Sequence, residues 1–238
     1  MHFEQHADVY RTARPPYPSA LWDEVLARVA PGTRVLDLGA GTGEATGPLL
    51  EAGARVTAVE PGPRLAAQLA AAHPSAMVLV ARAEDADLPA ADVAVAATAV
   101  HWFDLAVLLP RLHRALVPGG RFLVWRNVFG DPAVTTPFRE RVGQIVGARR
   151  APGRPGPDAQ DPAAAARALT EGGWFALEET ATFRWRTDLD EQQVHRLFST
   201  FSDWSPAEVE QASAAVTELG GRVTEHYLSW LLVLRATP

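Results

Sequence analysis

The sequence predicts an α/β protein with a doubly wound, mostly parallel sheet of seven strands, an antiparallel last strand and a helical cap. Three observations predict this fold. Short apolar runs alternate with helical segments through the first 130 residues, which is typical of strand–helix–strand units with right-handed crossovers. Three glycines follow the first apolar run closely. Helix-ending pairs, Pro31-Gly32 and Pro118-Gly119, separate helical segments from the runs after them.

The chain length of 238 residues suits one α/β domain better than two. We therefore expect a single domain over 1–238. Its cofactor-binding core should span about 30–130, and the cap should come from 1–30, 150–162 and 190–220. The content of 47% apolar and 21% charged residues is typical of a globular chain.

The first half supplies the regular alternation. A helix over 18–29 has apolar side chains at helical spacing and precedes the first strand. Strands are expected at 34–38, 54–59, 77–81, 92–98 and 121–125, with helices at 44–52, 64–73 and 105–116. Pro110 lies inside the last of these helices and predicts a kink or a break there.

The second half is less regular. A segment at 151–162 is too rich in proline and glycine for a helix or strand and is expected to form a loop or lid. Helices are expected at 136–146, at 163–170 and twice between 190 and 219, and strands at 175–186 and 227–235. Although helices separate the last two strands in sequence, the strands can pair antiparallel.

Composition excludes several classes of function. The chain has no cysteine and no lysine, which removes thiolate, Schiff-base and Walker-type chemistry. The net charge is -6 and the arginines are scattered, so nucleic acid is not an expected partner. No apolar run is long enough to cross a bilayer and no secretory signal is visible, so we expect no membrane partner and a cytoplasmic protein.

The histidines do not predict a catalytic metal. His73, His113, His195 and His226 are dispersed along the chain. None forms the i, i+4 pair of a helical zinc site. We therefore expect no metal in the site.

The segment Asp37-Leu38-Gly39-Ala40-Gly41-Thr42-Gly43 carries the most information about function. Its glycines allow a sharp turn and a close backbone approach to a ligand at the carboxyl edge of the sheet. The third glycine comes one residue earlier than in a dinucleotide fingerprint, and Glu44 would repel a pyrophosphate. An NAD-dependent dehydrogenase is therefore disfavoured.

Two carboxylates define the expected ligand. Asp37 lies near the end of the first strand, and Glu60 follows the second, where an acidic side chain can accept both hydroxyls of an unphosphorylated ribose. Such a site favours a neutral or cationic ligand. S-adenosylmethionine meets this requirement because it has a ribose diol, an amino group and a sulfonium, but no phosphate.

The motifs VLDLGAGTG, VTAVEP and LVPGGRFLV resemble those of the class I S-adenosylmethionine methyltransferases, in the family's order and spacing. The resemblance covers about half the chain and implies a Rossmann-like fold. It implies that the glycine turn lines the methionine part of the cofactor, that Glu60 binds the ribose and that Ala83 and Glu84 contact the adenine. The cofactor-binding residues expected in this core are Asp37, Gly39, Ala40, Gly41, Glu60, Pro61, Ala83, Glu84, Thr98 and Trp102.

A narrower resemblance joins the start FEQHADVYRTARPPYP and the segment TAVHWFD to the subgroup that contains trans-aconitate methyltransferases. It implies that Tyr10 and Arg14 close over the cofactor, with Arg14 on its carboxylate. A guanidinium can fork onto a carboxylate, and a tyrosine offers an apolar face with a hydroxyl. The alternative is that both residues only anchor the first helix.

His101 is the histidine at the carboxyl end of a central strand, where a base could reach an acceptor. It is the candidate catalytic base, with a structural histidine as the alternative. Methyl transfer can also proceed without a base, because a sulfonium is already a strong electrophile. Trp102 could stack on the adenine or enclose the acceptor, with core packing as the alternative.

The sequence thus predicts an enzyme that transfers a methyl group from S-adenosylmethionine to a small-molecule acceptor and releases S-adenosylhomocysteine. An oxygen acceptor, carboxylate or hydroxyl, is favoured. Two alternatives stay open: another use of S-adenosylmethionine on the same fold, and a cofactor-binding regulator without turnover. The expected state is a monomer or a homodimer.

Overall fold

The computed structural model describes residues 13–149, 160–201 and 203–238. It divides into two compact units. Among the described residues, the sheet unit takes those of Tyr17–Asn127, Pro157–Phe183 and Ser229–Pro238, and the helical unit takes those of Met1–Pro16, Val128–Gly156 and Arg184–Leu228. Each unit is described below by itself.

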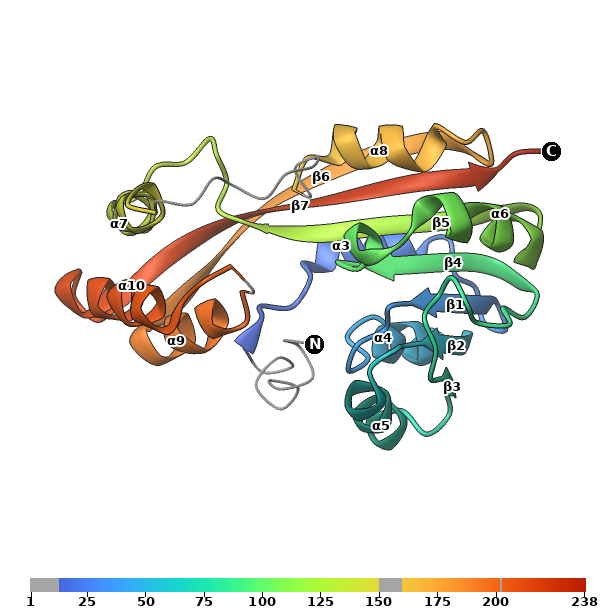
Figure 1. Ribbon diagram of the computed structural model, residues 1–238, viewed down its shortest axis with the longest axis horizontal. Helices are drawn as coiled ribbons and strands as arrows, with labels where there is room; N and C mark the ends of the chain where they lie inside the picture. Colours follow the sequence, from blue (N-terminus) through green and yellow to red (C-terminus); the bar gives the residue numbers. More distant parts are fainter. Residues whose placement is uncertain (1–12, 150–159, 202) are drawn as a thin grey trace. The chain divides into compact units, whose positions relative to one another are not determined.

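The seven strands of the sheet follow the order β3-β2-β1-β4-β5-β7-β6 (Figure 1). Their order shows a crossover after β3, which places β1 and β4 side by side at the centre. The strands are β1 (Arg34–Leu38), β2 (Arg55–Val59), β3 (Met77–Leu79), β4 (Ala91–Ala97), β5 (Leu116–Phe129), β6 (Phe175–Asp190) and β7 (Arg222–Ala236).

Strands β1 to β5 run parallel. Val35 pairs with Val56 of β2 and with Val93 of β4, and β4 continues the register onto β5. The last strand is antiparallel, as predicted. Its direction follows from its contacts with β6, because Thr237, just after β7, bonds to Trp174, just before β6. The carboxyl ends of β1, β2 and β4 therefore meet at one edge.

The helices alternate with the strands as expected. They are α3 (Ser19–Leu26), α4 (Thr46–Glu51), α5 (Pro63–Ala72), α6 (Leu105–Ala115), α7 (Pro137–Gly147), α8 (Pro162–Thr170), α9 (Glu191–Ser199) and α10 (Pro206–Glu218), with a short 3-10 helix η1 (Val100–Trp102). Side-chain caps fix several starts. The Asp104 carboxylate accepts from two backbone N–H groups of α6, and Ser205 forms a capping box with Glu208.

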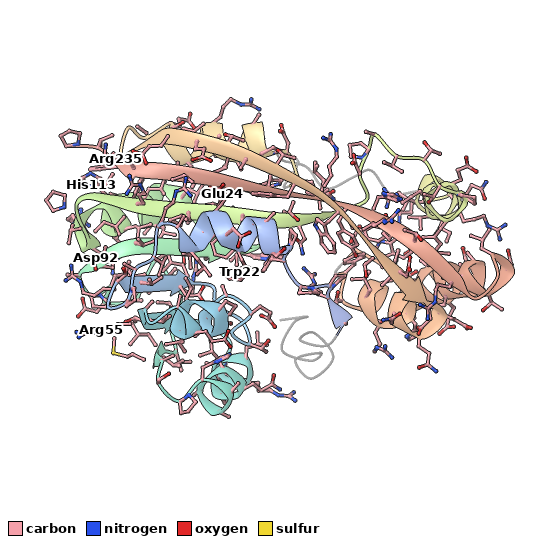
Figure 2. All side chains as sticks on the ribbon, turned by 180° about the vertical axis from the view of Figure 1, so that it is seen from behind. Trp22, Glu24, Arg55, Asp92, His113 and Arg235 are labelled. Carbon is pink, nitrogen blue, oxygen red and sulfur yellow. The ribbon has the colours of Figure 1, made fainter. Side chains whose placement is uncertain are left out.

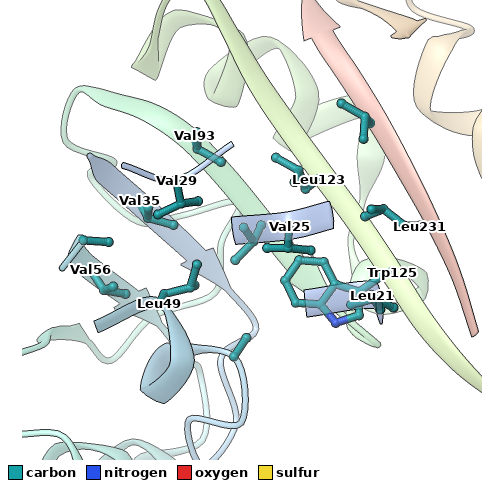
Figure 3. Close-up of a cluster of buried hydrophobic side chains, with 14 residues drawn as sticks. Leu21, Val25, Val29, Val35, Leu49, Val56, Val93, Leu123, Trp125 and Leu231 are labelled. Carbon is teal, nitrogen blue, oxygen red and sulfur yellow. The ribbon is translucent and has the colours of Figure 1, made fainter. Parts of the chain in front are cut away.

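The core of the sheet unit lies between α3 and the central strands (Figure 3). Leu21 and Val25 of α3 are fully buried against Leu123 and Trp125 of β5. Tyr17 meets the Trp125 ring edge-on at 5.9 Å between ring centroids. Each such buried apolar side chain contributes about 1.5–3 kcal/mol. This packing fixes α3 against β5, one of the strands whose ends form the site.

At the opposite edge of the sheet, where the parallel strands begin, an ion pair joins two neighbouring strands. Arg34 at the start of β1 donates to both oxygens of Asp92 in β4, at 3.0 and 2.7 Å. Asp92 and Arg55 mark this edge (Figure 2). The bidentate pair keeps β1 and β4 in register.

The helical unit has its own core. Phe198 of α9 is fully buried and meets Trp204 edge-on at 4.3 Å between ring centroids. The cluster joins α7, α9 and α10 through Phe138, Val142, Leu189, Val194, Leu197, Phe198, Val209, Ala212, Ala215, Val216 and Val223. Phe201 packs against the same cluster.

Several predicted boundaries differ from the structure. Helix α6 is continuous through Pro110, so the predicted break does not occur. Strand β5 begins at Leu116 rather than 121, and β7 begins at Arg222 rather than 227. Both extensions include polar or glycine residues that apolar periodicity overlooks, because neighbouring strands supply the pairing. No helix in the described ranges is both long and apolar enough to span a bilayer.

Candidate functional site

The glycine turn follows β1 and depends on left-handed backbone conformations. Gly39, Gly41 and Gly43 have φ values of 69, 59 and 99°, which a residue with a Cβ atom adopts only at a cost of about 1–2 kcal/mol. A Cβ at Gly39 would lie 2.7 Å from the Cβ of Ala99. The absence of a side chain therefore lets the turn pack directly against the segment that follows β4.

His73 explains two further glycines. A Cβ at Gly43 would lie 2.6 Å from the His73 ring, and one at Gly47 would lie 2.9 Å from it. The imidazole, at the C-terminal end of α5, thus packs against the glycine turn and the first turn of α4. This contact fixes how α4 leaves the turn.

Glu60 braces the turn from the end of β2. One carboxylate oxygen accepts from the backbone N–H of Gly41 at 2.9 Å, and the other accepts from Gly62 at 2.8 Å. The side chain is only 6% exposed. Each carboxylate oxygen can accept more than one hydrogen bond, so this brace is compatible with the predicted contact to a ribose. Pro61 lies in the loop after β2, between Glu60 and Gly62.

Asp37 is fully buried beside the turn. Its Oδ2 accepts a 2.6 Å hydrogen bond from the Thr46 hydroxyl, while Oδ1 has no hydrogen-bond partner among the described residues. Burial raises the pKa of Asp37 to about 7, the Thr46 hydrogen bond opposes this rise, and the charges of Glu44 and Glu60 add to it. A positively charged ligand group beside Asp37 would stabilise its ionised carboxylate and lower its pKa.

Glu84, a predicted adenine contact, already accepts hydrogen bonds from other groups of the protein. It is 6% exposed and accepts from Arg82 at 3.1 Å and from the backbone N–H of Asp104 at 2.8 Å. Burial alone would raise the pKa of Glu84, but these hydrogen bonds lower it. Glu84 thereby ties the loop after β3 to the start of α6. The adjacent Ala83 is buried at 2% exposure.

Thr98 follows β4 in a strained conformation. Its φ of 55° is left-handed, which is unfavourable for a β-branched residue. The Thr98 N–H donates to the carbonyl of Trp125 at 2.8 Å, and its hydroxyl lies 2.9 Å from the Tyr17 hydroxyl. Strain of this kind clusters at functional sites. Sequence reasoning missed Tyr17, although it is one of three tyrosines in the chain.

His101 pairs with a residue that the sequence did not indicate. The guanidinium Nη1 of Arg126 lies 3.0 Å from His101 Nδ1. Arg126 directly follows the buried run of β5, and a charged residue immediately after an apolar run is a signal that could have been used. Trp102 is 48% exposed beside the His101 ring, so core packing is not its role here.

Arg14 and Tyr10 are the remaining predicted cofactor residues. Arg14 belongs to the helical unit, where its Nε donates to the Thr200 hydroxyl at 3.3 Å and its guanidinium lies 5.7 Å from the Phe201 ring centroid. Tyr10 lies outside the described residues. The roles predicted for both on the cofactor stay predictions. Within the described parts of the chain, no group of three or more histidine or acidic side chains could hold a metal ion.

The arrangement is one edge of a sheet with a tight glycine turn, an acidic brace and a strained loop. Residues 36–124 match the family model described as a methyltransferase domain. Uncharacterized methyltransferases of Mycobacterium tuberculosis and Mycobacterium bovis are each 41% identical over 128 residues. The match covers 52% of this chain and 52% of each relative, so the chain spans about half the length of the curated relatives it matches.

Solved structures extend the likeness to the whole fold. A proposed type II methyltransferase from Anaeromyxobacter dehalogenans is 28% identical with a TM-score of 0.67, covering 94% of this chain and 97% of that one. A geranyl diphosphate C-methyltransferase from Streptomyces coelicolor, solved with S-adenosyl-L-homocysteine, is 14% identical with a TM-score of 0.51, covering 92% and 79%. The latter shows the fold alone. The predicted Rossmann-like methyltransferase fold is confirmed.

Proposed function

We propose that the protein transfers a methyl group from S-adenosylmethionine to an oxygen of a small-molecule acceptor. The observation that carries the proposal is the brace between Glu60 and Gly41, which holds a glycine turn beside buried acid groups. The methyltransferase-domain match and the methyltransferase relatives support an S-adenosylmethionine-dependent enzyme. The resemblance to the trans-aconitate methyltransferase subgroup suggests a small acid or a similar oxygen acceptor.

The residues of the site fit this cofactor. Asp37 and Glu60 are buried, and Glu44 adds a third negative charge close to Asp37. Phosphate oxygens would be repelled here, whereas a cationic nucleoside would be stabilised. The buried Oδ1 of Asp37, which has no hydrogen-bond partner among the described residues, is suited to a positively charged donor.

When bound, S-adenosylmethionine supplies a methyl group on a sulfonium, which an acceptor oxygen can attack without further activation. The chain's own residues then orient the two reactants and exclude water. Gly39, Ala40 and Gly41 would hold the methionine part, Glu60 the ribose, and the loop of Ala83 and Glu84 the adenine. Thr98 and Trp102 follow β4, next to these groups in the fold.

His101 is better suited to donate a hydrogen bond than to accept a proton. A guanidinium has only donors, so the pair with Arg126 makes His101 Nδ1 the acceptor. A neutral imidazole with an accepting Nδ1 carries its proton on Nε2. His101 would therefore orient the acceptor, whose oxygen would attack either as a carboxylate, which is already deprotonated, or as a hydroxyl that has released its proton to water.

The test has two steps. Calorimetry with S-adenosylmethionine, S-adenosylhomocysteine and NAD should show binding of the first two and none of NAD, and Glu60→Gln should weaken that binding about tenfold by loss of a charged hydrogen-bond acceptor. Incubation with a panel of carboxylic acids and phenols should then release S-adenosylhomocysteine and make the acceptor heavier by one CH₂, about 14 mass units. Formation of S-adenosylhomocysteine separates methyl transfer from a cyclisation on the same fold. Binding of NAD at this turn would overturn the proposal.

A further inference from the structure

The helical unit contains a buried carboxylate that the proposed cofactor site does not use. Glu225 lies on β7 and is 0% exposed. Neither of its oxygens has a hydrogen-bond partner among the described residues. Leaving one buried acceptor unpaired costs about 1–3 kcal/mol, and more for a charged group. A side chain kept at such a cost calls for a functional explanation.

Tyr227 adds a second polar group of the same kind. It follows Glu225 by two residues, so both side chains lie on one face of β7, which agrees with the alternating burial of this strand. The Tyr227 hydroxyl is also buried without a hydrogen-bond partner among the described residues. Burial and the charge of Glu225 raise the pKa of Tyr227, while the charges of Arg14 and Arg139 oppose this rise; the pKa stays raised, so the phenol is neutral and can donate. The two residues thus present an acceptor and a donor side by side.

Aromatic rings flank this polar pair. Trp185 of β6 stacks on the Tyr227 ring, with 4.5 Å between centroids and 15° between planes. Phe129 of β5 meets the same ring edge-on at 5.7 Å. Flat apolar surfaces around a few polar atoms are typical of small-molecule sites.

Arg139 balances the charge of Glu225 without satisfying its hydrogen bonds. Its Nε lies 3.9 Å from Glu225 Oε1, and its guanidinium lies 4.8 Å from the Phe129 ring centroid. Gly130 makes room for it, because a Cβ there would overlap the guanidinium. Burial raises the pKa of Glu225 to about 7, and two neighbours oppose this rise: the charge of Arg139, and the nearby backbone N–H of His226, whose geometry falls short of a hydrogen bond. Glu225 thus has a positive charge nearby, but Glu225 and Tyr227 have no hydrogen-bond partners among the described residues.

The missing partner can be deduced from this chemistry. A carboxylate ligand would be repelled by Glu225. An ammonium could donate to Glu225 and to the Tyr227 oxygen, but it would leave the Tyr227 hydroxyl hydrogen without an acceptor and would be repelled by the charge of Arg139. A hydroxyl donates to the one residue and accepts from the other.

We propose that Glu225 and Tyr227 bind the hydroxyl group of a small aromatic molecule within the helical unit. The carboxylate takes the hydroxyl hydrogen in a hydrogen bond, and the Tyr227 hydroxyl donates to the hydroxyl oxygen. The ring of the ligand packs against the aromatic side chains.

Four probes test the proposal on the full chain: phenol, anisole, benzoate and benzylammonium, titrated by ligand-observed NMR with and without S-adenosylhomocysteine. Phenol should bind about tenfold more tightly than anisole, because anisole cannot donate to a charged acceptor. Benzoate and benzylammonium should both bind more weakly than phenol. Equal affinity for phenol and anisole, or tighter binding of either ion, overturns the proposal.

Isosteric variants test the residues themselves. Glu225→Gln should weaken phenol binding about tenfold and Tyr227→Phe about fivefold, with anisole unchanged. Glu218→Gln, an exposed residue of the same unit that pairs with Arg141, is the control and should leave phenol binding unchanged. Unchanged phenol affinity in both test variants overturns the proposal. Where a variant fails to fold, the probe series on the unaltered chain decides.

The two proposals fail separately. Phenol selectivity in a chain that binds no S-adenosylmethionine would sink the proposed function and leave the hydroxyl site standing. Release of S-adenosylhomocysteine with carboxylic acids alone, together with equal binding of phenol and anisole, would sink only the hydroxyl site.

Discussion

Arg126 Nη1 lies 3.0 Å from His101 Nδ1, and this pair determines what the histidine can do. The two residues come from β5 and from η1, which follows β4, so neighbouring parallel strands bring them together. Because the guanidinium cannot accept a hydrogen bond, the imidazole nitrogen must. The interpretation of His101 as a general base is therefore disfavoured by geometry, and the donor role is favoured.

Replacement of His101 separates these roles. Glutamine retains a side-chain donor but cannot act as a base near neutral pH. We expect His101→Gln to keep the rate of S-adenosylhomocysteine release within about tenfold of the unaltered enzyme, and His101→Phe to lose about a hundredfold. Equal and severe losses in both variants would instead indicate a base.

The sequence was sufficient for the sheet and for the glycine turn, because both depend on local patterns. The run RVLDL is a buried strand, and the three glycines after it all adopt positive φ. The pairs that complete the site are different. Tyr17 and Thr98 are 81 residues apart in sequence, and only their positions against β5 bring the hydroxyls together. No periodicity encodes such a contact.

Glu225 shows a second limit. In the structure, Val223, Glu225, Tyr227 and Ser229 are all buried, and the residues between them are less so. Had the strand been predicted to start at residue 222, this alternation would have placed the charged Glu225 on its buried face. Apolar patterning starts the strand at Tyr227 and leaves Glu225 outside it. The strand extends further because it pairs with its neighbours, and this tertiary contribution outweighs the local preference.

Asp37 should make stability depend on pH. Its pKa rises from 3.8 to about 7 on folding, so the unfolded chain loses this proton first as the pH increases. Stability is then lost progressively from about pH 4 to about pH 7, by at most a few kcal/mol. Asparagine does not titrate, so Asp37→Asn should not show this loss. The stability difference between the variant and the unaltered chain should therefore shift in favour of the variant as the pH rises over the same interval. Urea unfolding at pH 5 and pH 8, about one unit or more on either side of the shifted value, measures the difference.

The same group should couple cofactor binding to protons. A cation beside Asp37 favours the ionised carboxylate, so S-adenosylmethionine should release a proton on binding below about pH 7. Calorimetry in two buffers of different ionisation enthalpy counts that proton, and Asp37→Asn should abolish the release. The exposed Asp23→Asn serves as the control and should leave it unchanged. Proton release that persists in Asp37→Asn would assign the effect to another group.

Tyr17 should contribute stability through Thr98. Tyr17→Phe removes the 2.9 Å hydrogen bond while keeping the ring packed on Trp125, and should cost about 1 kcal/mol of unfolding free energy. Thr98→Gly loses the same bond but relieves the φ of 55°, which offsets about 1 kcal/mol. Its net effect should be close to zero. A larger loss in Thr98→Gly than in Tyr17→Phe would contradict the assignment of strain.

His73 and Gly47 should be coupled. Gly47→Ala places a Cβ 2.9 Å from the imidazole, so it should cost about 1–3 kcal/mol despite the better helix propensity of alanine. His73→Ala removes the obstacle, and the double variant should therefore be more stable than the sum of the two single changes predicts. Gly143→Ala is the matched control in α7, where a Cβ meets nothing within 4 Å. It should be neutral or stabilising by about 0.5–1 kcal/mol.

Replacing Gly130 should reduce the free energy of unfolding by more than backbone strain alone, because a side chain there would displace Arg139. Gly130 has a φ of 84°, and Gly221 has nearly the same φ of 83° with open space around it. Gly221→Ala therefore isolates backbone strain, at about 1–2 kcal/mol. Gly130→Ala carries that strain and also displaces the guanidinium that lies 3.9 Å from Glu225. It should cost at least about 1 kcal/mol more than Gly221→Ala.

The displaced cation should also change the titration of Glu225. Without Arg139 nearby, the pKa of this carboxyl should rise further above about 7. Because the folded-state pKa is then higher, the loss of stability with increasing pH should extend to more alkaline pH in Gly130→Ala than in Gly221→Ala. Unfolding curves of both variants measure this pH dependence between pH 6 and pH 9, from about one unit below to about two units above the pKa of Glu225. Parallel pH profiles would show that Arg139 does not stabilise the ionised form of Glu225.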